Sequence, residues 1–148
     1  MRAKPCFYPF FFALTLLVLT PSAWGKKASM DDEPWELIEL FEEGALYVER
    51  QSMQFNETEN TGQLRFLVAW KEAQEDFVGG EKYRSTKISA LYNCAERLET
   101  QLAEITYQGK MGTGKVLSKE TYDAPETYSF SEGSMEEKLW KMACKRDK

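Results

Sequence analysis

The sequence contains no histidine and only three cysteines among its 148 residues. The missing histidine excludes every catalytic triad or metal site that needs an imidazole. No two cysteines have the CxxC spacing of redox and zinc sites, and no serine lies in a GxSxG turn. We therefore expect a protein that is not an enzyme and that uses neither a cofactor nor a metal.

Basic residues are also few, because 19 Lys and Arg stand against 24 Asp and Glu, which gives a net charge of −5. A general nucleic-acid binder needs the opposite balance to neutralise phosphates. No motif in the sequence indicates a small-molecule substrate. The composition thus argues against nucleic acid and leaves another protein as the expected partner.

The chain lacks an apolar run long enough to cross a bilayer, which takes about 20 residues. Its longest run, Phe10–Leu19, follows two basic residues and is broken only by Thr15. Ala23 and Gly25 then place small residues at positions −3 and −1 of a cleavage site. This pattern is typical of a secretory signal peptide rather than a membrane anchor, and we predict one over residues 1–25.

The cleaved chain would begin with a polar arm over residues 26–34 and continue as one domain over residues 35–146. Cys6 lies before the apolar run, so it would leave with the signal peptide. No cysteine in the position of a lipid attachment site follows the run. We therefore expect an exported protein that resides in the periplasm. The alternative locations are the cell surface and the medium outside the cell.

The stretch Ser85–Cys94 has the alternation of a β-strand. Ile88, Ala90, Tyr92 and Cys94 are spaced two residues apart, so they share one face of that strand. Its intervening polar residues then point to the other side. A strand with this pattern directs its final cysteine into the core, where the thiol needs a partner.

Cys94 and Cys144 are the two cysteines that remain after loss of the signal peptide, in a compartment that favours oxidation. A reactive or metal-binding pair is the alternative, but it lacks both histidine and CxxC spacing. We predict a structural disulfide between them. Closing a loop of about 50 residues is expected to stabilise the fold by roughly 4 kcal/mol.

A C-terminal helix is predicted to begin at Ser134, which forms a capping-box pair with Glu137. The apolar side of this helix consists of Met135, Leu139, Trp140, Met142 and Cys144. A helix of about 12 residues is marginally stable by itself, so it must pack against a sheet.

Alternating side chains predict further strands over residues 35–41, 45–50, 64–70, 97–107 and 115–122. The segment 97–107 also shows helical spacing, but a hairpin from the preceding strand favours a strand. We expect that strand to be bulged near Ala95 and Glu96. The remaining predictions are turns at 42–44 and 109–114 and an irregular crossing over 123–133.

Two polar stretches, Gln54–Gly62 and Lys71–Gly80, are predicted as loops, although the charged start of the second could also form a helical turn. Loops on a rigid scaffold often carry recognition, so these two are where we would first look for binding. No individual residue in them stands out as a binding residue.

Two features could indicate chemistry but have simpler explanations. Gly109–Lys115 resembles a phosphate-binding GxxxxGK[ST] loop, but Val116 occupies the hydroxyl position and a strand-like pattern follows, which favours a hairpin turn. The adjacent acidic pairs at 42–43 and 136–137 could act as acid and base. We expect them to be solvated charges and predict no catalytic residue.

An ordered set of marks runs through the chain: Trp35, Gly44–Glu49, Ser52, Ser85, Lys87, Cys94, Tyr107, Gly114, Gly133, Ser134 and Cys144. This set resembles the bacterial surface-adhesin protein E family over nearly all of residues 35–145. Two positions depart from the family pattern, because Glu49 replaces the usual aspartate and Glu132 replaces a proline.

The resemblance implies an α+β fold, in which an antiparallel sheet of about six strands carries a C-terminal helix on its concave face, tethered by a disulfide. It also implies an exported bacterial protein whose type member is lipid-anchored and binds host extracellular-matrix and serum proteins. We thus expect an adhesin-like binding protein. The alternative is a periplasmic structural or accessory protein that meets only envelope components, and exposed sheet edges would allow a homodimer.

Overall fold

The computed structural model describes residues 34–75 and 80–145 of the chain. The predicted signal peptide and all of the predicted arm except Pro34 lie outside these residues. In chain order the elements are β1 (Trp35–Phe41), β2 (Gly44–Asn56), β3 (Thr61–Glu75), β4 (Lys82–Asn93), β5 (Leu98–Tyr107), the 3₁₀ turn η2 (Lys110–Gly112), β6 (Val116–Thr121), β7 (Thr127–Ser129) and α1 (Met135–Ala143).

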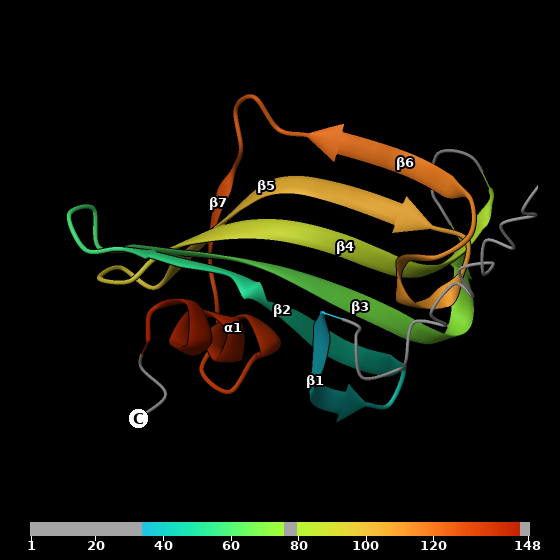
Figure 1. Cartoon of the computed structure of the whole chain (residues 1–148), viewed down its shortest axis with the longest axis horizontal. Helices are drawn as coiled ribbons and strands as arrows, with labels where there is room; N and C mark the ends of the chain where they lie inside the picture. Colours follow the sequence, from blue (N-terminus) through green and yellow to red (C-terminus); the bar gives the residue numbers. More distant parts are fainter. Residues whose placement is uncertain (1–33, 76–79, 146–148) are drawn as a thin grey trace, which may run out of the picture.

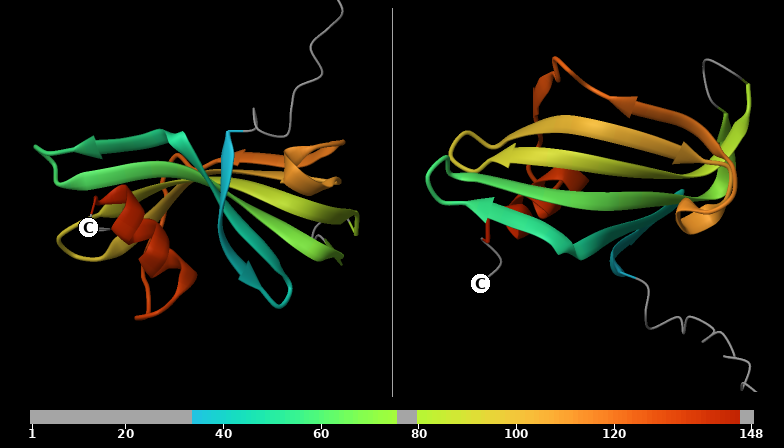
Figure 2. Two further views of the ribbon diagram at one scale, coloured as in Figure 1. Left: turned by 60° about the horizontal axis from the view of Figure 1, so that its bottom comes forward. Right: turned by 45° about the horizontal axis from the view of Figure 1, so that its top comes forward.

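The strands form one antiparallel, seven-stranded sheet in which sequence neighbours are also spatial neighbours, in the order β1-β2-β3-β4-β5-β6. The long middle strands twist strongly, and α1 packs against one face near the β2–β3 turn (Figures 1 and 2). The predicted α+β class, with about six strands and one C-terminal helix, is confirmed.

Two strands are longer than the sequence pattern predicted. β2 continues through Asn56 and β3 begins at Thr61, so the loop predicted over Gln54–Gly62 is reduced to a short turn. The charged residues after Trp70 also lie in β3, because its last residues still pair with β4, as Glu75 does with Lys82. The predicted loop over Lys71–Gly80 is therefore wrong in its first half, and residues 76–79 lie outside the described part of the chain.

The predicted bulge in the fourth and fifth strands is displaced. Ala95 and Glu96 lie in the hairpin turn itself, where the side-chain oxygen of Asn93 accepts hydrogen bonds from both of their amides, each at 3.0 Å. The register of β4 and β5 instead shifts between Ser89 and Ala90, which leaves Leu102 of β5 without an opposite residue.

The segment predicted to be an irregular crossing contains the short strand β7. The outer edge of β5 is shared by two strands, since its beginning pairs with β7 and its end pairs with β6. Three residues are too few for alternation to mark a strand in the sequence. Through β7 the chain returns along the sheet to the point where α1 starts.

The helix begins as the sequence predicted but is shorter, with nine residues. The hydroxyl of Ser134 accepts a hydrogen bond from the Glu137 amide at 3.2 Å. The Glu137 carboxylate reaches back to the amide of Gly133 at 2.7 Å, one residue before the cap. This arrangement satisfies amides at the helix start that would otherwise lack partners.

The core lies between α1 and one face of the sheet. Its buried side chains from the strands are Leu46, Val48, Leu64, Phe66, Val68, Ala90, Tyr92 and Cys94, and those from the helix end of the chain are Leu139, Trp140, Met142, Ala143 and Cys144. The face predicted from the Ser85–Cys94 alternation is thus the face that α1 covers, and Ile88 lies at its margin as a partly buried residue.

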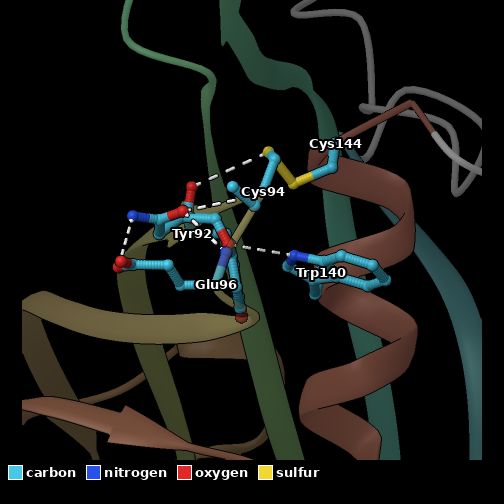
Figure 3. Close-up of a disulfide and its surroundings, with 7 residues drawn as sticks. Tyr92, Cys94, Glu96, Trp140 and Cys144 are labelled. Carbon is cyan, nitrogen blue, oxygen red and sulfur yellow. Dashed lines mark hydrogen bonds between the residues drawn. A yellow bond between two sulfur atoms is a disulfide. The ribbon is translucent and has the colours of Figure 1, made fainter.

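A disulfide joins Cys94, just beyond β4, to Cys144 at the end of α1, with 5.7 Å between the two Cα atoms. Beside it, the Trp140 indole donates a hydrogen bond to the carbonyl oxygen of Asn93 at 3.2 Å (Figure 3). The tether predicted for the fold therefore connects the helix to the same sheet face that its apolar side covers.

The backbone of β3 contacts the end of α1 directly at Gly62. A Cβ atom at this position would lie 2.4 Å from the carbonyl oxygen of Ala143. We expect Gly62→Ala to displace the helix end and to lower the free energy of unfolding by about 1–3 kcal/mol, measured by urea denaturation. Gly80→Asn serves as the control, because Gly80 has no neighbouring atom within 4 Å and asparagine tolerates its positive φ. Equal stability of the two variants would contradict this contact.

Candidate functional site

The face of the sheet opposite α1 carries a hollow of about 350 Å³. Five strands each contribute a side chain to its walls, namely Trp35 from β1, Glu49 from β2, Arg65 from β3, Lys87 from β4 and Tyr107 from β5. Trp35, Glu49 and Arg65 are paired across neighbouring strands, and the same line continues through Ser89 and Ala103. Lys87 lies two residues from Ser89, and Tyr107 lies four residues from Ala103. Because side chains alternate along a strand, all of these residues share one face of the sheet. In the right view of Figure 2 the helix lies behind the sheet.

Lys87 is the central cation of this hollow. Its Nζ atom lies 5.4 Å from the centre of the Trp35 ring and 5.0 Å from the centre of the Tyr107 ring. Both distances allow a favourable interaction between the ammonium group and the aromatic faces. Within residues 34–75 and 80–145, no carboxylate forms an ion pair with Lys87.

The β5–β6 turn holds the stem of Lys87 in place. Gly112 of η2 packs so closely that a Cβ atom there would lie 2.1 Å from Cε of Lys87. The fully buried Ser85 fixes this turn, since its hydroxyl donates to the Gly109 carbonyl at 2.6 Å and accepts from the Gly112 amide at 2.9 Å. The predicted hairpin turn at Gly109–Lys115 is confirmed, and its role is to support one wall of the hollow.

Glu49 and Arg65 form a second polar wall. Their side chains make two short contacts, Nε to Oε2 at 2.8 Å and a terminal guanidinium nitrogen to Oε1 at 3.0 Å. The hydroxyl of Ser52 bridges the irregular part of the β2–β3 ladder by donating to the Glu49 carbonyl and accepting from the Arg65 amide. Because the pair neutralises itself, Lys87 provides the uncompensated positive charge of the hollow.

Sequence reasoning did not identify this hollow as a site. Trp35, Glu49, Ser85, Lys87 and Tyr107 were named as marks of the family resemblance and lay in predicted strands, but none was predicted to belong to a site, and the structure brings all five together. One signal in the sequence could have indicated it. In the predicted strand over Ser85–Cys94, the polar residues, Lys87 among them, point away from the core face, and this second face of the sheet is where the hollow lies. No described residue of the two segments chosen for recognition lines the hollow.

The acidic pairs also differ from expectation in part. Glu42 and Glu43 are exposed at the β1–β2 turn, as predicted. Glu137 is not a solvated charge, because it is buried and its carboxylate lies 2.6 Å from Arg97 and 3.6 Å from Lys141. The hydrogen bond from the Gly133 amide lowers the pKa of Glu137, and the two neighbouring cations add to this effect.

Among the described residues, Glu99 is the buried carboxyl on the sheet face toward α1 whose pKa moves upward. Burial raises the pKa of Glu99 from its ordinary value of 4.5, and the charge of Glu136 acts in the same direction. The folded protein therefore holds this proton more tightly than the unfolded chain. Its contribution to stability is complete below the unfolded pKa and is lost as the pH rises through the raised, folded-state pKa.

We expect Glu99→Gln to be more stable relative to wild type at pH 7.5 than at pH 4, because glutamine removes the cost of a buried charge. Urea denaturation of both proteins at the two pH values measures this difference. Glu59→Gln, an exposed change in the β2–β3 turn, should show no such trend. A Glu99→Gln effect that is the same at both pH values would contradict the assignment.

No group of three or more His, Cys, Asp or Glu side chains among the described residues is placed to hold a metal ion. No helix among these residues is both long and apolar enough to span a membrane.

These features define a class of protein: a seven-stranded antiparallel sheet, one C-terminal helix tethered to it by a disulfide, and a basic and aromatic hollow on the face opposite that helix. The chain belongs to the Surface-adhesin protein E family, whose pattern it matches over residues 35–145. The family is one of adhesin-like surface proteins.

Solved structures of protein E from Haemophilus influenzae share the fold. One has a TM-score of 0.54 and 17% sequence identity, with 74% of this chain and 84% of that chain covered. Protein E from non-typeable Haemophilus influenzae has a TM-score of 0.52 and 16% identity, with 74% and 75% covered. A search of curated proteins finds no match.

Proposed function

We propose that this chain is an exported, non-enzymatic, adhesin-like protein that binds other proteins, with host matrix or serum proteins as its partners. The observation that supports this proposal is the family match, which spans every strand and the helix of the described fold. An exported location agrees with the signal-peptide pattern of residues 1–25 and with a disulfide between Cys94 and Cys144, since oxidised cysteines persist outside the cytosol.

The test is direct binding of the purified chain, from Lys26 onward, to immobilised matrix proteins and to plasminogen. We expect saturable binding to at least one of them, with a plain albumin surface as the blank. The same chain after heat denaturation under reducing conditions is the control for non-specific adhesion. Absence of saturable binding to every protein tried would refute the host-partner proposal.

A periplasmic accessory role is the second candidate. The sequence feature that favours it is the position of Cys6, which precedes the apolar run, so that no cysteine closely follows the run to accept a lipid. Protease treatment of intact cells separates the two proposals. A surface adhesin is degraded by the added protease, whereas a periplasmic protein is degraded only after the outer membrane is opened.

A further inference from the structure

The hollow on the face opposite α1 combines three properties: apolar surface, aromatic rings and one positive charge. Its floor and sides include the apolar Ala103 and Ile105, its rings are Trp35 and Tyr107, and Lys87 supplies a charge. Its volume of about 350 Å³ lies within the range of about 300–1,000 Å³ that is common for small-ligand pockets. The combination is that of a binding site with one oriented cation.

We propose that this hollow binds a single ring of an acidic saccharide, with the carboxylate or sulfate of the sugar on Lys87 and the ring against Trp35 or Tyr107. A sugar ring presents C–H groups on one face, which pack on an aromatic side chain, and hydroxyl groups around its edge. The Glu49–Arg65 pair and the Ser89 hydroxyl border the same hollow and offer partners for those hydroxyl groups.

The charge of the site fits a ligand with one negative group. Both guanidinium contacts of Arg65 engage Glu49, at 2.8 and 3.0 Å, so Arg65 is already neutralised. Lys87 alone among these walls has no carboxylate partner within the described residues. One ammonium group, flanked by two aromatic faces that exclude water from its sides, suits a carboxylate or sulfate better than a multiply charged phosphate cluster.

A peptide is a poorer fit for this place in the sheet. Peptides that bind to sheets add a strand at an edge, where backbone groups are unpaired. The hollow instead lies over β2 to β5 and includes only Trp35 from the edge strand β1, and the ladder through Glu49, Arg65, Ser89 and Ala103 pairs each of the middle strands with its neighbours. Only side chains are available to a ligand in this position, which is how saccharide rings are held.

The acidic sugar has two possible sources that share this chemistry. One is a host polysaccharide that contains uronic acid, and the other is the carboxylated sugar of the bacterial cell wall. The test therefore uses a hyaluronan tetrasaccharide and N-acetylmuramic acid as separate probes, with neutral chitotetraose and an acidic peptide as comparisons. Binding is followed by NMR chemical-shift changes of the Trp35 indole and the Lys87 amide.

We expect at least one acidic saccharide to shift these two signals in a saturable and salt-sensitive manner, while chitotetraose binds more weakly. Lys87→Met retains the stem beneath Gly112 but removes the charge, and it should weaken binding by about tenfold or more while the melting temperature falls only by the small loss of the ring contacts with Trp35 and Tyr107. Lys138→Met removes the same charge from α1, on the other face, and should leave binding unchanged.

Three outcomes would overturn the proposal: no shift with either acidic saccharide, unchanged affinity in Lys87→Met, or tighter binding of the acidic peptide at the same signals. The proposal does not depend on host-protein binding. The immobilised-protein assay described above can fail while the saccharide titration succeeds, and the reverse result is equally distinguishable.

Discussion

Replacing Cys94 and Cys144 together by alanine is expected to lower the free energy of unfolding by roughly 4 kcal/mol, because the cross-link closes a 50-residue separation and restricts the unfolded chain. For a domain of this size the loss corresponds to a fall in melting temperature of roughly 15 °C. Thermal and urea unfolding, followed by circular dichroism, measure both quantities. The loss arises from the greater freedom of the unfolded chain and not from a single contact in the folded state.

A reducing agent provides the control for the disulfide variant. Reduction should destabilise the wild type to nearly the level of the double alanine variant and should leave that variant unaffected. If the variant and the oxidised wild type unfold at the same urea concentration, the tether contributes nothing and the helix is held by packing alone.

Leu139→Ala should cost about 2–5 kcal/mol, the usual range for truncating a buried leucine. Leu139 is fully buried at the centre of the contact between α1 and the sheet, and a nine-residue helix has little stability without that contact. Urea denaturation measures the loss, and near-ultraviolet circular dichroism reports whether Trp140 keeps its fixed surroundings.

Lys141→Ala is the matched change on the same helix. Its side chain is partly exposed and lies 3.6 Å from the buried Glu137, which keeps Arg97 and the Gly133 amide as partners, so the variant loses one half-exposed ion pair worth about 0–1 kcal/mol. Similar losses in the two variants would mean that helix formation, rather than the packing of Leu139, limits stability.

The architecture could be predicted because its signals are local and periodic. Alternation identified the strand that ends at Cys94 and the long strand around Phe66, and the Ser134–Glu137 pair marked the helix start. Strand ends were predicted less well, since polar residues such as those after Trp70 continue a strand only because β4 lies beside them. That partner is not visible in the segment's own pattern.

The candidate site was not predictable by the same reasoning. Its lining residues come from five different strands, so no single segment contains the whole motif. Lys87 looks in the sequence like any exposed lysine. Its surroundings follow from the register of four strand pairs and from the way Gly112 folds onto its stem. Strand register is fixed only in the assembled sheet. The sequence therefore predicted the fold but not the site.

The distance along the chain between the two bonded cysteines sets an order of events. A polypeptide delivered amino end first presents the Cys94 thiol while β5, β6, β7 and α1 are still to come, and the bond can close only when Cys144 has arrived. A molecule truncated before residue 144 would keep a reactive thiol at the end of β4, open to mixed disulfides with oxidoreductases or with a second truncated copy. Oxidation of this pair therefore marks the molecules whose delivery has been completed.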